Sequence, residues 1–191
     1  IKAEQKRALT GNLPKIFYDE THDYPSPPYP YGSAGWTEDD EYVLIYDRYD
    51  LWKIDPSGKE KPVNITQGYG RKNKIRLRLI TLDKEAEFID PKEPLFLYGF
   101  DEETKKSGYF KSSVKKAKTP ESLIFKKKRI SSRPIKAKDA DYLLWTQEDI
   151  EEYPNLRLST LSFDNPDKIT SVNKERIAKY NWASVEEVKW I

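Results

Sequence analysis

The feature that most constrains the fold of this chain is a pattern of short strands and turns that occurs three times, about 50 residues apart. In its clearest copy, an acidic turn at residues 38–41 precedes an almost continuous apolar run at 42–47. A second strand is predicted at 51–54, and a Pro-Ser-Gly turn then leads to a third strand. The apolar runs at 95–98 and 142–145 occupy equivalent places in the other two copies. A repeat of roughly 40–50 residues with four strands is typical of a β-propeller blade.

We therefore predict an all-β fold, a partial β-propeller of about three four-stranded antiparallel blades with little helix. The predicted organisation begins with an irregular, Pro-rich N-terminal connector at residues 1–34. Three blade-like repeats follow at 35–75, 76–127 and 128–175, and a further strand is predicted at 176–191. The alternative is an ordinary antiparallel sandwich, whose strands also recur at regular spacing.

The composition excludes several classes of protein. Hydrophobic residues make up 37% of the chain and charged residues 35%, so the core is thin, and the 13 Tyr, 7 Phe and 5 Trp must supply much of it. The net charge of +2 favours no class of partner through long-range electrostatics. The absence of Cys rules out disulfides and thiolate catalysis. No apolar run reaches the ~18–20 residues of a membrane span, so no membrane partner is expected, and no cofactor or metal is expected either.

Three segments of the chain resemble the propeller region of the prolyl oligopeptidase family of serine peptidases. They are Tyr-Pro-Tyr-Gly-Ser-Ala-Gly-Trp-Thr-Glu-Asp-Asp at 29–40, Leu-Ile-Tyr-Asp-Arg-Tyr-Asp-Leu-Trp at 44–52 and Asn-Ile-Thr-Gln-Gly-Tyr-Gly-Arg-Lys-Asn at 64–73. The likeness is nearest to the large secreted members typical of Bacteroidetes-type bacteria. Residues 180–191 resemble the segment that leads from the propeller to the hydrolase domain, so the likeness covers about 30–191.

In that family a β-propeller caps an α/β-hydrolase domain, which carries a Gly-x-Ser-x-Gly nucleophile motif, then an Asp, then a His. This chain has no Gly-x-Ser-x-Gly, and its only His, His22, lies in the Pro-rich connector. A Ser-His-Asp system needs the imidazole beside the nucleophile. The resemblance therefore implies an inactive region that gates access and orients peptide substrates for a hydrolase domain absent from this chain. It also implies a periplasmic or secreted location.

Because the chain contains no Met and begins at Ile1, we expect it to be processed or excised from a longer chain. A partial propeller exposes apolar blade faces, so we also expect self-association through these faces. Trp36, Trp52 and Trp145 recur near equivalent strands and are expected to pack between blades.

The candidate substrate-binding residues are four carboxylates in a predicted hairpin tip, where the third repeat is longer than the first: Glu148, Asp149, Glu151 and Glu152. Loop tips are where scaffolds place binding groups. Carboxylates there can capture the amino terminus of a peptide through charge-assisted hydrogen bonds. The alternative is a solvated acidic tip without a ligand.

Two other functions remain open from the sequence. Residues 105–138 contain thirteen Lys and Arg but only one acidic residue, Glu121, which is consistent with a nucleic-acid binder. No recognition motif accompanies this basic stretch. The other alternative is a self-contained propeller-like module that binds a protein or a glycan.

Overall fold

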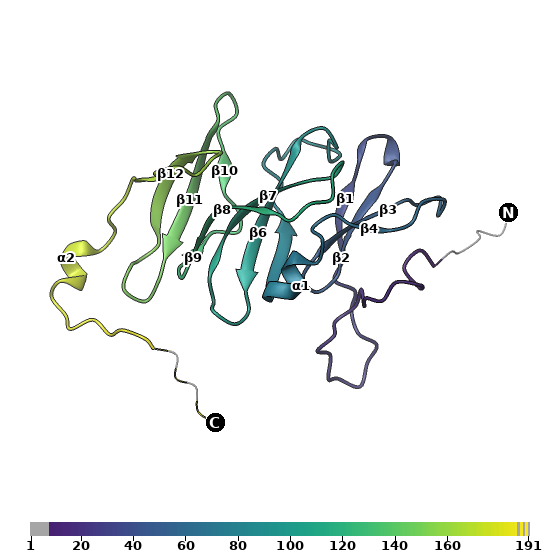
Figure 1. The fold of residues 1–191 in the computed structure, drawn as a ribbon. Coiled ribbons are helices and arrows are strands. Elements are labelled where there is room, and N and C mark those ends of the chain that lie inside the picture. Colours follow the sequence, from purple (N-terminus) through teal and green to yellow (C-terminus); the bar gives the residue numbers. More distant parts are fainter. Residues whose placement is uncertain (1–7, 187, 189, 191) are drawn as a thin grey trace.

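A computed structural model of the chain, which describes residues 8–186, 188 and 190, contains three small antiparallel sheets (Figure 1). The sheets follow one another along the sequence and have four, four and five strands. Over the described residues, helix is restricted to the 3-10 turn η1 (Glu38–Asp40), α1 (Tyr69–Asn73) and α2 (Lys174–Ile177). The prediction of a mostly β fold with little helix is therefore confirmed. No described helix has the length and apolar character needed to cross a membrane.

The first sheet is a meander with the strand order β1-β2-β3-β4. Its strands are β1 (Ser33–Trp36), β2 (Val43–Tyr46), β3 (Leu51–Ile54) and β4 (Val63–Asn64). The turn after β3 is closed by the Asp55 carboxylate, which accepts hydrogen bonds from the main-chain N–H groups of Ser57, Lys59 and Glu60. Gly58 lies in this turn with a φ of 70°, a left-handed conformation that glycine adopts without steric cost.

The second sheet repeats this topology with the order β5-β6-β7-β8. Its strands are β5 (Ile75–Leu79), β6 (Pro94–Asp101), β7 (Ser107–Ser113) and β8 (Glu121–Lys126). The short helix α1 connects it to the first sheet. In β5 the side chains of Ile75 and Leu77 are buried, whereas Arg76 between them is exposed, as the two-residue period of a strand requires.

The third sheet has the order β10-β11-β12-β13, and β9 also pairs with β11. Its strands are β9 (Arg129–Ile130), β10 (Ile135–Lys136), β11 (Tyr142–Glu148), β12 (Asn155–Thr160) and β13 (Asp167–Lys168). β9 and β10 pair with opposite ends of β11 and are the two halves of one interrupted strand. The interruption includes Pro134, which has no N–H to donate to a sheet.

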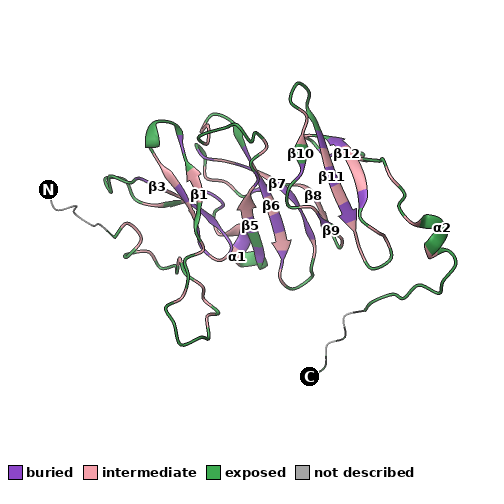
Figure 2. Cartoon of the chain, turned by 180° about the vertical axis from the view of Figure 1, so that it is seen from behind, coloured by how far each residue is buried: buried purple, intermediate pink, exposed green. Residues whose placement is uncertain are grey.

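The middle sheet is buried on both faces, because successive side chains of a strand point to opposite sides (Figure 2). The first core lies between the first and second sheets. There Leu97 of β6 and Phe110 of β7 pack with Leu44 of β2 and Leu51 of β3, and all four side chains are fully buried.

The second core lies between the second and third sheets. Tyr109, the residue before Phe110, points into it together with Ile124 of β8. From the third sheet, Leu143 and Trp145 of β11 meet them, and the Tyr109 and Trp145 rings are 6.0 Å apart in an edge-on arrangement. Such aromatic pairs add stabilisation to the burial of apolar area.

The two outer faces of the row of sheets differ. On the outer face of the first sheet, the N-terminal segment places Phe17 against Trp52, with ring centroids 5.6 Å apart. The outer face of the third sheet is open to solvent. Ile135 and Tyr142 there are 56% and 50% exposed, and Leu158 is half-buried. In the described part of the chain this face is therefore a solvent-exposed, partly apolar sheet surface.

The predicted packing of three tryptophans between blades holds only for Trp145. Trp36 pairs with Val43 and Trp52 pairs with Ile45, and these positions lie on the outer face of the first sheet. Trp36 is therefore 44% exposed, and Trp52 packs against Phe17 of the N-terminal segment. The register of β1 and β3 against β2 decides which face of the sheet each tryptophan occupies, and the repeat spacing does not determine this register.

The strand predicted for residues 176–191 is not found. Its first residues belong to α2, and residues 178–186, 188 and 190 form neither helix nor strand, while 187, 189 and 191 lie outside the described residues. Trp182 instead donates its indole N–H to the carbonyl oxygen of Ile150 and packs against Tyr153. An alternating sequence needs a neighbouring strand to pair with, and no described strand lies beside this segment.

The three sheets form an open row, with the first and third sheets at its two ends (Figure 1). They begin at Ser33, Ile75 and Arg129, near the predicted starts of the repeats at residues 35, 76 and 128. Over the described residues the row does not close into a ring.

Shortening a side chain of the first core is expected to destabilise the protein strongly. Leu97 is fully buried, so Leu97→Ala leaves a cavity and should lower the free energy of unfolding by about 2–5 kcal/mol. Urea denaturation followed by tryptophan fluorescence measures the change. The control Val172→Ala, at a side chain that is 43% exposed, should change stability by less than about 0.5 kcal/mol. Equal effects of the two substitutions would contradict the assignment of the core.

The open face of the third sheet predicts self-association that depends on protein concentration. Tyr142→Lys combined with Leu158→Lys places charges on this face and should yield a monomer in sedimentation velocity experiments. Tyr24→Lys is the control, because Tyr24 is 73% exposed and lies in the N-terminal segment. A wild-type protein that stays monomeric at high concentration would refute the prediction.

Candidate functional site

The four predicted carboxylates come together in one hairpin at the end of β11. Glu148 is the last residue of this strand, and the loop that follows leads to β12. The N–H of Asp149 donates to the carbonyl oxygen of Glu152 at 3.0 Å, and the N–H of Glu152 donates back at 3.4 Å. The turn is further closed by the N–H of Glu151, which donates to the Asp149 carboxylate at 2.9 Å. The predicted hairpin tip is therefore formed.

Glu152 is the centre of a charged network rather than an open acceptor. Its two oxygens lie within 2.9–3.3 Å of five side chains of the same chain: Lys128, Gln147, Asn155, Arg157 and Lys168. The side chain is only 15% exposed. Burial raises the pKa of Glu152, but hydrogen bonds from Lys128, Lys168 and Gln147 outweigh this effect and lower the pKa to about 2.

Two of the other three carboxylates are also paired with cations. Asp149 lies 2.7 Å from Lys128, and Glu148 lies 2.7 Å from Arg129. Only Glu151 has an exposed carboxylate without a side-chain partner among the described residues. An amino group that bound at Glu152 would have to displace a lysine or an arginine. The assignment of all four residues to substrate binding stays a prediction, and Glu151 is the member most accessible to a ligand.

The single histidine does not form a catalytic pair. Nε2 of His22 lies 2.6 Å from the carbonyl oxygen of Ser26 and 3.3 Å from its Oγ. A carbonyl oxygen only accepts hydrogen bonds, so Nε2 carries the hydrogen and has no lone pair with which to take a proton from the hydroxyl. A nucleophilic serine needs such a base. The contact therefore stabilises an exposed turn.

The segment 44–52, which carries part of the family resemblance, contains two buried aspartates. The Asp50 carboxylate accepts hydrogen bonds from Thr66 Oγ1 at 2.7 Å and from the N–H groups of Gly70 at 2.9 Å and Arg71 at 3.0 Å. Burial raises the pKa of Asp50, and these hydrogen bonds oppose the rise. Their effect is to hold α1 against the loop between β2 and β3, so this aspartate has a structural role.

The other buried aspartate, Asp47, accepts hydrogen bonds from two main-chain N–H groups and from the indole N–H of Trp52 at 3.0 Å. The Arg71 guanidinium lies 3.6 Å from the Asp47 carboxylate and also forms a bidentate ion pair with Glu20. The hydrogen bond with Glu20 raises the pKa of Arg71. These contacts fasten the N-terminal segment to the first sheet and leave no free acceptor for a ligand at Asp47.

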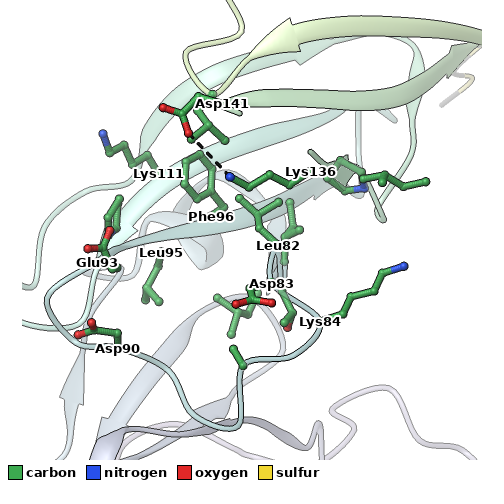
Figure 3. Close-up of a pocket in the computed structure, with 18 of the residues that line it drawn as sticks. Leu82, Asp83, Lys84, Asp90, Glu93, Leu95, Phe96, Lys111, Lys136 and Asp141 are labelled. Atoms are coloured by element: carbon green, nitrogen blue, oxygen red, sulfur yellow. Dashed lines mark ion pairs between the residues drawn. The ribbon is translucent and has the colours of Figure 1, made fainter. Parts of the chain in front are cut away.

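A large cavity lies between the second and third sheets, at the end of β11 opposite to the acidic hairpin (Figure 3). Its volume is about 1270 Å³, and the fourteen-residue loop 80–93 between β5 and β6 forms much of its wall. Leu82, Leu95 and Phe96 are among the apolar side chains that line it. We call this cavity the inter-sheet pocket.

The rim of the inter-sheet pocket carries an excess of negative charge. Eight lining residues are acidic and four are lysines, although the whole chain has a net charge of +2. Lys136 and Asp141 form a loose ion pair at 3.8 Å across part of the rim (Figure 3). The sequence contains one signal for this site: a long loop with Asp83, Glu85, Glu87, Asp90 and Glu93 between two apolar strands. Loops longer than about 12 residues inside a compact domain are often functional.

Among the described residues there is neither a metal-binding cluster nor a continuous basic surface. No group of three or more His, Cys, Asp or Glu side chains among them is arranged to hold a metal ion. The basic residues between 105 and 138 do not form one stripe, because β8 separates the lysines at 115–118 from those at 126–128 by roughly 20 Å. Three of the cations are also paired with carboxylates: Lys128, Arg129 and Lys136.

Comparisons of the chain with protein-family models, with curated proteins and with solved structures find no match. The likeness to the propeller region of prolyl oligopeptidases therefore rests on the residues of the three resembling segments.

Loss of the negative charge at Glu152 is expected to destabilise the protein in a pH-dependent way. Because the pKa of Glu152 is about 2 in the folded protein, against a reference of 4.5, the network stabilises the fold fully above about pH 4.5. This contribution is lost as the pH falls through 2. Glu152→Gln should therefore lower the free energy of unfolding by about 1–2 kcal/mol at pH 7 and by progressively less below pH 4.5.

Urea denaturation of wild type and variant from pH 7 to pH 2.5 measures this difference. Glu151→Gln is the matched control, since it removes a carboxylate from the same hairpin without breaking an ion pair seen among the described residues. It should change stability by less than about 0.5 kcal/mol at every pH. A Glu152→Gln effect that does not vary with pH would contradict the network.

Proposed function

We propose that this chain is a non-catalytic set of consecutive β-propeller blades from a serine peptidase that resembles prolyl oligopeptidases. In this proposal it narrows the access of peptides and orients them for a hydrolase domain elsewhere in the same protein. The observation that carries the proposal is the succession of three antiparallel meanders, each built in chain order and packed face to face on the next. Radial repetition of such sheets is how propellers are built.

The direction of the strands supports the blade interpretation. The second strands of the second and third meanders, β6 and β11, run the same way (Figure 1). Loops that connect equivalent strands consequently gather at the same end of the row, and loops at one end of a rigid scaffold are suited to forming a common binding surface. An ordinary sandwich of two sheets does not require three meanders of the same internal order.

The chemistry of the described residues also fits an inactive region. The only histidine donates a hydrogen bond from Nε2 to the carbonyl oxygen of Ser26, so this nitrogen cannot serve Ser26 as a base. Glu152 and its hairpin neighbours are engaged mainly with cations of the same chain. Peptide orientation, and not bond cleavage, is therefore the role that these residues support.

The protein alone is expected not to hydrolyse peptides, whereas the natural gene product is expected to be a peptidase. Sequencing of the gene beyond the codon for Ile191 should reveal Gly-x-Ser-x-Gly, then Asp, then His within about 200–300 residues. The full gene product should react with a fluorophosphonate probe at the serine of that motif and cleave prolyl p-nitroanilide peptides. This chain should do neither.

A gene that continues into an unrelated domain, or that ends soon after this segment, would overturn the peptidase proposal. A stand-alone module that binds a protein or a glycan would then be the better explanation. Nucleic-acid binding would be recognised by an affinity that falls steeply as salt rises. The split arrangement of the lysines around β8 does not favour it.

A further inference from the structure

The floor of the inter-sheet pocket is apolar and firmly supported from below. Leu82, Phe96, Leu123 and Leu161 line it, and each is a partly buried residue that packs against the second core. That core contains the fully buried rings of Tyr109 and Trp145, which hold the floor in place. Floors of this kind, with a few polar groups around them, are typical of ligand sites.

A further apolar side chain stands at the mouth of the pocket. Phe88, in the loop between β5 and β6, lines the pocket and is 46% exposed. An exposed aromatic side chain beside a supported apolar floor provides a surface that a ligand side chain can bury.

The carboxylates of the rim are available to a cation. Among the described residues, Asp83 and Asp90 each accept a hydrogen bond only from the main-chain N–H two residues further along the chain, at 2.9 and 2.7 Å. Asp141, whose ion pair with Lys136 is 3.8 Å long, is 81% exposed. Glu93 also lines the pocket and has no ion pair among the described residues. The rim thus attracts positive charge and repels anions.

One edge of the pocket is a strand edge. Residues 121–123 of β8 line the pocket, and β8 is the last strand of the second sheet, paired only with β7. In the described structure its other edge has no strand partner. An extended peptide can add to such an edge through its main chain while its side chains enter neighbouring pockets.

We propose that the inter-sheet pocket binds an extended peptide segment that carries both apolar side chains and positive charge, from Lys, Arg or a free amino terminus. Apolar side chains would lie on the floor, the cationic groups would face the acidic rim, and the main chain would run along β8. The volume of about 1270 Å³ exceeds the roughly 300–1,000 Å³ of small-molecule sites, which favours a chain of several residues as occupant. This inference rests on the proposed function, for which it supplies the peptide-binding site, but its test needs no hydrolase.

The probe is the six-residue peptide Lys-Leu-Phe-Lys-Leu-Lys amide, titrated into the full chain by isothermal calorimetry at low salt. We expect saturable one-to-one binding. The acidic counterpart Glu-Leu-Phe-Glu-Leu-Glu amide should bind at least about tenfold more weakly, because it faces the same carboxylates with like charge. The polar counterpart Lys-Ser-Ser-Lys-Ser-Lys amide should also bind at least about tenfold more weakly, because it has no apolar side chains for the floor.

Two pairs of substitutions test the position of the site. Phe88→Ser with Leu82→Ser removes apolar surface at the mouth and on the floor and should weaken binding about tenfold or more. Asp83→Asn with Glu93→Gln should weaken binding severalfold and reduce its dependence on salt. The matched control Glu151→Gln removes an exposed carboxylate at the opposite end of β11 and should leave the affinity unchanged. Far-UV circular dichroism verifies that each variant is folded.

Binding of the acidic peptide as tight as that of the basic one would overturn the inference. An affinity that neither pair of pocket substitutions changes would overturn it as well. Peptidase activity of the full gene product, combined with the absence of binding here, would remove this inference but keep the proposed function. Peptide binding at the pocket, combined with a gene that encodes no peptidase, would remove the proposed function but keep this inference.

Discussion

The arrangement of the three sheets depends on how side chains of the middle sheet alternate between its two faces. Tyr109 and Phe110 are neighbours in β7, yet one enters the second core and the other enters the first. Two glycines, which have no side chain, allow the Phe110 ring and the neighbouring strand β8 to approach the main chain closely. A Cβ at Gly99 would lie 2.4 Å from the Phe110 ring, and a Cβ at Gly108 would lie 1.8 Å from the carbonyl oxygen of Ile124. Because both cores are built on the same strands, the positions of the outer sheets follow from how the middle sheet presents its two faces.

Buried and half-buried carboxylates then fix the ends of the sheets. Asp50 holds α1 to the loop after β2, and Glu152 brings together side chains from four segments at the end of the third sheet. A carboxylate that receives several donors can remain charged at low exposure, since hydrogen bonds replace the lost water. Charge in the described structure is thus used in two ways: it forms ion pairs and hydrogen bonds that stabilise these loops, and around the inter-sheet pocket it is exposed, with one long ion pair between Lys136 and Asp141.

The sequence was sufficient to predict the local structure of the central strands. The apolar runs at residues 42–47, 95–98 and 142–145 correspond to β2, β6 and β11, because continuous apolar runs bounded by turn residues are a local signal. It was not sufficient to predict which face a side chain occupies. Trp52 points outward because of the register between β2 and β3, which is a property of the pair of strands.

The candidate sites show the same limit. The acidic hairpin at residues 148–152 was predicted from its composition and place, but its pairing with Lys128 and Lys168 joins residues far apart in the chain. Only the folded chain brings these cations to Glu152. The inter-sheet pocket was missed, since its floor consists of residues that read individually as core. The long acidic loop before β6 was the one local signal that pointed to it.

The divided first strand of the third sheet has a consequence for how copies of this protein meet. β9 and β10 contain two residues each, and Pro134 lies in the gap between them. This border offers no continuous row of main-chain donors and acceptors with which a strand from another molecule could pair. Growth of fibrils by strand addition is therefore discouraged at this border of the third sheet.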